Sequence, residues 1–219
     1  MPLVFVIFAI LATVASAAIV FVGVGCTQGL RRSVLAGLAA VALALYAVCL
    51  WRSPQSWVVS DTLVLSVAVL AGGLLSLSLA SDAAVVAFLT VGAVVDAFSS
   101  TLGLTAALLK SYVAGKSHLL EVLSISAPFD GKVIPIVGIS DLFFLGVVFS
   151  ALGRFGHRRA ASFLVPTGGL VLALAVAFLT NFVAALPEVA LVTIVYLALH
   201  RRARVSLPIG TLDHCRTDP

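Results

Sequence analysis

The chain has 219 residues, of which 62% are hydrophobic and only 10% are charged, and its mean hydropathy is +1.22. Soluble domains carry roughly 25% charged residues, because a surface that faces water must be largely polar. The composition therefore excludes a soluble globular protein and predicts a membrane protein. The net charge of +4 comes mainly from arginines at the ends of apolar runs. That distribution indicates membrane topology rather than nucleic-acid binding, so we expect no nucleic-acid partner.

Seven apolar runs follow one another along the chain, and most approach the length of about 20 residues that crosses a membrane as a helix. They cover residues 3–25, 33–51, 62–80, 84–108, 133–152, 162–182 and 186–200. We expect an all-α fold, a polytopic transmembrane helix bundle of about seven spans that forms a single domain over residues 1–219. Its expected parts are three N-terminal helices (1–82), a part with the candidate catalytic residues (83–200) and a C-terminal tail (201–219).

The first run resembles a signal peptide only superficially. It has no positively charged residue ahead of it, and it continues past the small residues near Ala17. We therefore interpret it as a retained transmembrane helix. Further along, Ala71-Gly72-Gly73 and Thr167-Gly168-Gly169 place small residues inside two runs. Such residues let neighbouring helices approach closely, and packing is their expected role.

Positively charged residues predict the orientation. Nine of the thirteen lysines and arginines follow the first, fifth and seventh runs, and an odd number of spans brings these segments to one side. Because positive charge gathers in cytoplasmic loops, the N-terminus is expected outside the cell and the C-terminus in the cytoplasm.

One long loop, Leu109–Lys132, is expected on the outer side. Within it, His118–Leu123 fits a short interfacial helix, although a flexible tether fits the same residues. The stretch after the loop, Gly131–Val137, is rich in β-branched residues and contains Pro135. It is either extended, and able to pair with an unwound substrate, or the frayed start of the next helix with Pro135 in its first turn. We favour the helix start.

Two of the nine acidic residues lie well inside apolar runs. The other seven are at the ends of runs or in loops: Asp61, Asp82, Glu121, Asp130, Glu188, Asp213 and Asp218. Asp96 and Asp141 remain. An acid at the centre of a bilayer costs roughly 2.5–3.5 kcal/mol on insertion scales, so such a residue is a functional candidate. No lysine or arginine lies deep enough in a run to neutralise either one, but two facing carboxyl groups can share a proton. Consecutive helices are usually neighbours, so we expect Asp96 and Asp141 to face each other at direct or water-bridged distance.

The order of these residues resembles a known family. Asp96 in one helix, Gly138-Ile139-Ser140-Asp141 in the next and Ala185-Leu186-Pro187 at the start of the last are similar to the motifs of the presenilin and signal peptide peptidase family of GxGD-type intramembrane aspartyl proteases. The stretch from Asp141 to Gly156 also resembles prokaryotic members. This sequence differs from the family pattern at three positions: Val95 replaces a tyrosine, Ser140 replaces the second glycine, and Ala184 replaces the first proline of P-A-L.

The resemblance implies an enzyme, an aspartic endopeptidase that cleaves transmembrane helices within the bilayer. It implies Asp96 and Asp141 as the catalytic pair and places Ala185-Leu186-Pro187 beside it, with Gly138, Ile139 and Ser140 as the other expected substrate-binding residues. A helix that starts at Pro187 leaves unpaired amides ahead of it, and these are suited to holding substrate backbone. The expected partners are a transmembrane peptide substrate and the lipid bilayer, and the expected location is a prokaryotic cell membrane. The sequence does not indicate an oligomeric state.

Other interpretations stay open. Ser99, Ser100, Thr101 and Ser140 either line a polar cavity that water enters or make ordinary hydrogen bonds between helices. Asp96 and Asp141 would also suit a proton- or cation-coupled transporter, and a non-catalytic membrane scaffold is a third alternative. The three cysteines and four histidines show no metal-ligand spacing, so we expect no metal, haem or other cofactor.

Overall fold

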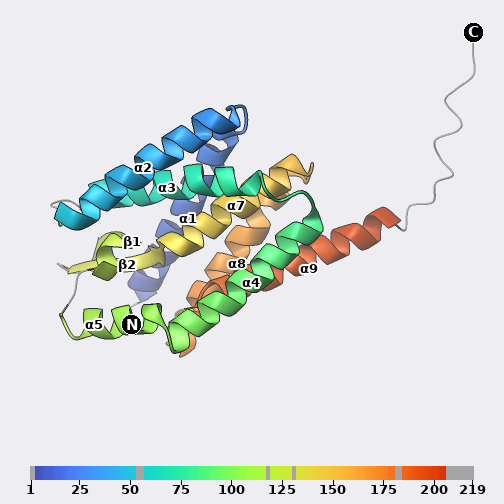
Figure 1. Ribbon diagram of the computed structural model, residues 1–219. Helices are drawn as coiled ribbons and strands as arrows, with labels where there is room; N and C mark the ends of the chain where they lie inside the picture. Colours follow the sequence, from blue (N-terminus) through green and yellow to red (C-terminus); the bar gives the residue numbers. More distant parts are fainter. Residues whose placement is uncertain (1–2, 53–56, 117–118, 130–131, 181–183, 206–219) are drawn as a thin grey trace, which may run out of the picture.

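The computed structural model describes residues 3–52, 57–116, 119–129, 132–180 and 184–205. Nine helices and one antiparallel pair of strands make up this part of the chain (Figure 1). The helices are α1 (Leu3–Thr27), α2 (Arg32–Arg52), α3 (Trp57–Ser76), α4 (Asp82–Thr101), α5 (Leu104–Val113), α6 (Leu119–Val122), α7 (Ile139–Arg154), α8 (Arg159–Thr180) and α9 (Leu186–Val205). The strands are β1 (Ser124–Phe129) and β2 (Lys132–Gly138).

The prediction of a membrane helix bundle is confirmed, but the number of spans is not. Within the described residues, five helical segments are long and apolar enough to cross a membrane: α1, α2, α3, α4 together with α5, and α8. Helix α7 has 16 residues, about 24 Å at 1.5 Å per residue, which is short of a hydrocarbon core of about 30 Å. Helix α9 has 20 residues but carries Glu188 in its first turn and arginines near its end.

Helix α7 is the centre of the bundle. It packs against α1, α3 and α8, and its residues from Leu145 to Leu152 are all buried. The closest approach is to α3, where a Cβ atom added to Gly146 would lie 2.5 Å from the carbonyl oxygen of Ala68. A Cβ on Gly72 would meet the backbone of α7 at 3.0 Å, and one on Gly169 would lie 2.6 Å from Cα of Val189 in α9. Glycine therefore sets the distance between helices at these contacts, as predicted for the small-residue runs.

The predicted span 84–108 lies within one apolar segment, Asp82–Val113, but its helix is not continuous and breaks at Leu102 and Gly103. The backbone of Gly103 is extended, and a Cβ there would lie 2.8 Å from Cα of Ser99. Beyond the break, the Ser99 hydroxyl accepts a hydrogen bond from the amide of Thr105 at 3.4 Å. This bond satisfies one of the free amides that every helix start presents. Helix α5 then runs away from the end of α4 beneath the strands (Figure 1).

The predicted long loop, Leu109–Lys132, contains part of α5, all of α6 and all of β1. The expected short helix is present as α6, and His118 lies outside the described residues. Polar side chains tie this segment to the bundle. The Tyr46 hydroxyl of α2 and the Ser60 hydroxyl of α3 donate to the Val122 carbonyl at 3.0 and 3.1 Å, so that this buried carbonyl has partners.

The favoured helix start at Pro135 is also wrong, because residues 132–138 form strand β2 and α7 begins only at Ile139. The two strands pair from Ser124 opposite Gly138 to Phe129 opposite Lys132, with an irregularity that leaves Ile136 without an opposite residue. Proline supplies no amide and disfavours a helical residue before it, while β-branched neighbours suit a strand.

Asp61 was expected at the end of a span but lies in the second turn of α3. Its carboxylate accepts a hydrogen bond from the Ser126 amide of β1 at 3.2 Å. The remaining helices begin and end within about six residues of the predicted bounds. Helix α9 continues to Val205, so the first five residues of the expected tail 201–219 are helical, and residues 206–219 lie outside the described part.

The contact of Gly146 with α3 predicts a stability difference between two matched substitutions. Gly146→Ala should lower the free energy of unfolding by about 1–3 kcal/mol, because a methyl group has no room beside a backbone carbonyl. Gly168→Ala in α8 meets nothing within 4 Å and should be neutral or stabilising by up to about 1 kcal/mol. Titration of both purified variants from mild detergent into sodium dodecyl sulfate, followed by circular dichroism, measures the difference. Equal stabilities would contradict the packing described.

Candidate active site

Asp96 is held by the start of α9. Its side chain is half-buried although Val94 and Val95 beside it are exposed on the outer surface of α4. The Oδ2 atom accepts hydrogen bonds from the amides of Ala185 and Leu186, both at 3.1 Å. These amides precede the first full turn of α9 and have no partner within that helix. Asp96 therefore fixes α4 to α9, and the helix start offsets the cost of keeping a carboxylate out of water.

Asp141 is held by the start of its own helix. It is the third residue of α7, and its Oδ2 atom accepts a hydrogen bond from the Gly138 amide at 3.3 Å. The arrangement is that of a capping box, in which an acid in the first turn reaches back to the residue before the helix. The positive end of the helix dipole favours the ionised form there.

Both aspartates were expected well inside apolar runs, but the structure places each near the end of its helix. Asp96 lies five residues before the end of α4, and Asp141 lies in the first turn of α7. The break at Gly103 and the extended β2 shorten both helices on the same side. Each carboxyl group is thus near a helix end, where backbone donors are available.

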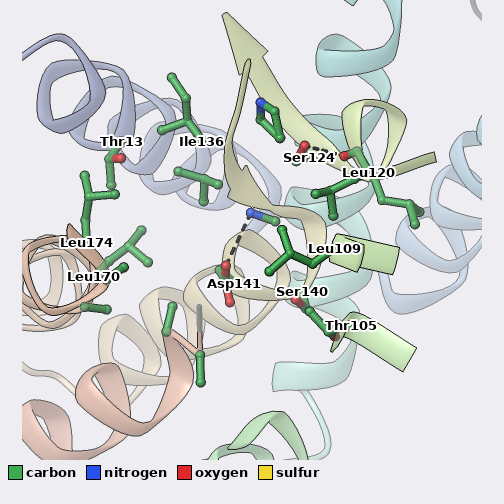
Figure 2. Close-up of a pocket in the computed structure, with 18 of the residues that line it drawn as sticks. Thr13, Thr105, Leu109, Leu120, Ser124, Ile136, Ser140, Asp141, Leu170 and Leu174 are labelled. Atoms are coloured by element: carbon green, nitrogen blue, oxygen red, sulfur yellow. Dashed lines mark hydrogen bonds between the residues drawn. The ribbon is translucent and has the colours of Figure 1, made fainter. Parts of the chain in front are cut away.

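The two aspartates line one cavity of about 340 Å³. Figure 2 shows Asp141 and Ser140 below β2, with Leu170 and Leu174 of α8 on one side and Thr105 and Leu109 of α5 on the other. The Asp96 carboxylate is close enough to act electrostatically on Asp141. The expected direct or water-bridged contact between the two carboxyl groups stays a prediction. No lysine or arginine belongs to the lining among the described residues.

Three of the six predicted substrate-binding residues line this cavity, namely Gly138, Ser140 and Ala185. Ile139, Leu186 and Pro187 do not belong to its lining. The amides at the start of α9, expected to hold substrate backbone, include two that donate to Asp96. Among the departures from the family pattern, Ala184 lines the cavity. Val95 is 61% exposed and faces away from it.

The serines and threonine after Asp96 do not line the cavity, although Ser140 does. The Ser99 hydroxyl pairs with the Thr105 hydroxyl at 2.9 Å, and Thr101 donates to the Ala97 carbonyl at 2.8 Å. Ser99 therefore makes the expected hydrogen bond between helices, from α4 to α5, whereas Thr101 bonds within α4.

Four polar residues of the lining were missed from the sequence: Thr13, Thr105, Tyr112 and Ser124. The Tyr112 hydroxyl donates to the Val133 carbonyl at 3.2 Å, which joins α5 to β2. Thr13 was the one signal present, a polar residue in the middle of the first apolar run. The other three lie on α5 and β1, whose existence the sequence did not reveal.

In the part of the chain that the structure describes, no three His, Cys, Asp or Glu side chains come together in a way that could hold a metal ion. The cavity offers two carboxyl groups, the hydroxyl groups of its threonines, serines and tyrosine, and an otherwise apolar wall. This set is suited to acid–base chemistry on a bound water.

No protein-family model, no curated protein and no solved structure matches this chain. The resemblance to the presenilin and signal peptide peptidase family therefore depends on the residues of the motifs alone.

The bonds from α9 to Asp96 predict a local effect on hydrogen exchange. Asp96→Ala removes the acceptor of two amides, and leaving each buried donor unpaired costs about 1–3 kcal/mol. Deuterium uptake at Ala185 and Leu186 should therefore become at least about fivefold faster. Asp96→Asn keeps a carbonyl oxygen at the same place and should retain most of the protection. Mass spectrometry of peptides covering residues 184–190 provides the measurement, with peptides of α1 as the internal reference. Unchanged exchange in Asp96→Ala would contradict the contact.

Proposed function

We propose that this protein is an intramembrane aspartyl protease that hydrolyses peptide bonds of transmembrane helices with Asp96 and Asp141 as its catalytic pair. The observation that carries the proposal is that these two acids, from two helices far apart in the sequence, line one cavity of a membrane helix bundle. The resemblance of the three motifs to the presenilin and signal peptide peptidase family supports the same reaction.

In the proposed reaction, the ionised carboxylate takes a proton from a water molecule between the pair. The protonated carboxyl group polarises the carbonyl of the peptide bond. Either aspartate is able to carry the charge, because each already accepts at least one backbone amide hydrogen bond. The pair titrates as a unit, so we assign the roles of acid and base to the pair and not to its members.

The proposed substrate is a transmembrane helix that unwinds near the cavity. Its freed amides and carbonyls need partners, since lipid offers none. Strand β2 borders the cavity from Ile134 to Gly138, and pairing of the unwound segment with an extended strand would supply those partners. The apolar wall from α8, including Leu170 and Leu174, suits the side chains of such a segment.

Replacing each aspartate with asparagine distinguishes a protease from a cation-coupled transporter and from a non-catalytic scaffold. Asp96→Asn and Asp141→Asn each remove the ionisable proton while keeping size and hydrogen bonding. Each alone should abolish cleavage of a transmembrane substrate, and the double variant should be no worse than either single one, because the residues act as a unit. The measurement is cleavage of a transmembrane peptide by purified protein in liposomes.

Asp61→Asn is the matched control, because Asp61 also accepts a backbone hydrogen bond but does not line the cavity. It should retain cleavage. In a cation-coupled transporter the two catalytic substitutions would instead abolish ion-driven uptake, and in a scaffold they would change stability alone. Substantial cleavage by purified Asp141→Asn protein would end the protease proposal.

We also propose seven spans, with α7 and α9 as the two that are less apolar, an external N-terminus and a cytoplasmic C-terminus. The α1–α2 turn, the α7–α8 junction and the C-terminal end of α9, which carry most of the arginines, lie at one end of the bundle (Figure 1). By the positive-inside rule this end faces the cytoplasm.

A reporter fused after the last residue tests the orientation. A fluorescent protein that folds only in the cytoplasm should be bright there, and a phosphatase that is active only outside should be inactive. The same two reporters fused ahead of the first residue should give the opposite result. Phosphatase activity at the C-terminus would overturn the topology.

A further inference from the structure

A second cavity lies at the arginine-rich end of the bundle, between the end of α1 and the junction of α7 and α8. Its volume is about 460 Å³. The polar part of its lining comes from Gln28, His157, Arg159 and Ser162, and Phe21, Val24 and Phe149 are among the apolar residues. Among the described residues, no acidic side chain belongs to this lining. The Ser162 hydroxyl donates to the Arg158 carbonyl at 3.2 Å, and both ring nitrogens of His157 have protein partners. The cavity therefore offers a ligand the amide of Gln28 and the positive charge of Arg159.

Other residues hold the polar side chains of this lining in place. The buried His157 ring contacts the Tyr196 hydroxyl with Nδ1 and the Asp82 carboxylate with Nε2, both at 3.2 Å. The Gln28 amide lies over Gly153, where a Cβ would come within 2.8 Å of Nε2. The Arg159 guanidinium lies 5.8 Å from the centre of the Phe21 ring, and within the described part of the chain it forms no ion pair. Its charge is therefore available to an anion.

An apolar groove adjoins this cavity and shares Phe21, Val22 and Arg159 with it. Its volume is about 310 Å³, and its remaining lining consists of Ala18, Ala160 and Phe163. The groove lies between α1 and α8, two helices that are long and apolar enough to cross a membrane. A polar compartment and an apolar one thus adjoin, and Arg159 lines both. An amphiphile, with a charged head and an apolar chain, fits such an arrangement.

We propose that this pair of compartments binds an anionic phospholipid, with its phosphodiester beside Arg159 and an acyl chain in the groove. Charge complementarity supports this occupant, since Arg31, Arg32 and Arg158 belong to the same end of the bundle. Basic residues at the membrane surface attract anionic lipids, and the apolar groove gives the chain of such a lipid a place that a free phosphate cannot use. The proposal is independent of the proposed protease function.

Native mass spectrometry of the full-length protein, titrated with phosphatidylglycerol or phosphatidylcholine, measures the site. Arg159→Gln should weaken phosphatidylglycerol binding about fivefold, the effect expected for one basic residue near an anionic lipid. Arg158→Gln removes the same charge from the neighbouring residue, which lines neither compartment, and should change binding less than twofold. Equal losses in both variants would show a diffuse surface attraction and overturn the proposal.

The acyl chain has its own pair of variants. Ala18→Phe fills the groove and should weaken phosphatidylglycerol binding severalfold. Ala15→Phe, on an exposed position of α1 outside the groove, should not. Millimolar inorganic phosphate should not displace the lipid from the unmodified protein. Displacement by phosphate, or unchanged binding in Ala18→Phe, would show a site for a free anion and contradict a lipid site.

Discussion

The arrangement of this bundle depends on the backbone amides at the starts of α7 and α9. Lipid offers such amides no acceptor, and here the acceptor comes from the protein itself. Asp141 supplies it for α7, and Asp96 supplies it for α9 from a different helix. Hydrogen bonds to a charged group contribute about 1.5–3 kcal/mol each. The two acids therefore stabilise these helix starts, and the same hydrogen bonds hold their side chains at the cavity.

This double role explains how two costly residues are tolerated. A carboxylate in lipid is unfavourable by several kcal/mol, but helix starts provide both donors and the positive end of a dipole. Neither acid needs a lysine or arginine as partner, which leaves their charges free of fixed counter-ions. A catalytic pair requires that condition, because a permanent ion pair would hold one carboxylate ionised and prevent the exchange of roles.

The sequence was sufficient for what composition and length determine. Apolar runs located the helices, the small residues at Gly72 and Gly169 located close contacts, and the depth of Asp96 and Asp141 in those runs singled out both acids. It was insufficient where a short-range effect overrides the apolar pattern. Gly103 ends α4 within a continuous apolar run, and Pro135 with its β-branched neighbours extends residues that hydropathy alone assigns to a helix.

The errors in the candidate site follow from those two errors in the fold. Ser99 and Thr101 were candidates for a polar cavity lining in a helix expected to continue to residue 108, whereas the break turns α5 under the strands. Thr105 and Tyr112 take their place in the cavity. Asp61 lies just before the predicted span 62–80, whereas α3 begins at Trp57. Its acceptor role also depends on strand β1, which has no distinct hydropathy signal.

The contact between α3 and α7 also bears on how distant relatives of this chain could be recognised. Four-letter motifs recur by chance in alanine- and glycine-rich helices, but the carbonyl of Ala68 leaves no room for any side chain at position 146. A homologue that keeps this packing must keep glycine five residues after its second aspartate, with a small residue opposite it in the third helix. Steric exclusion at Gly146 thus adds to the aspartate motif a residue that is constrained by packing alone, and the two together are far rarer by chance than either alone.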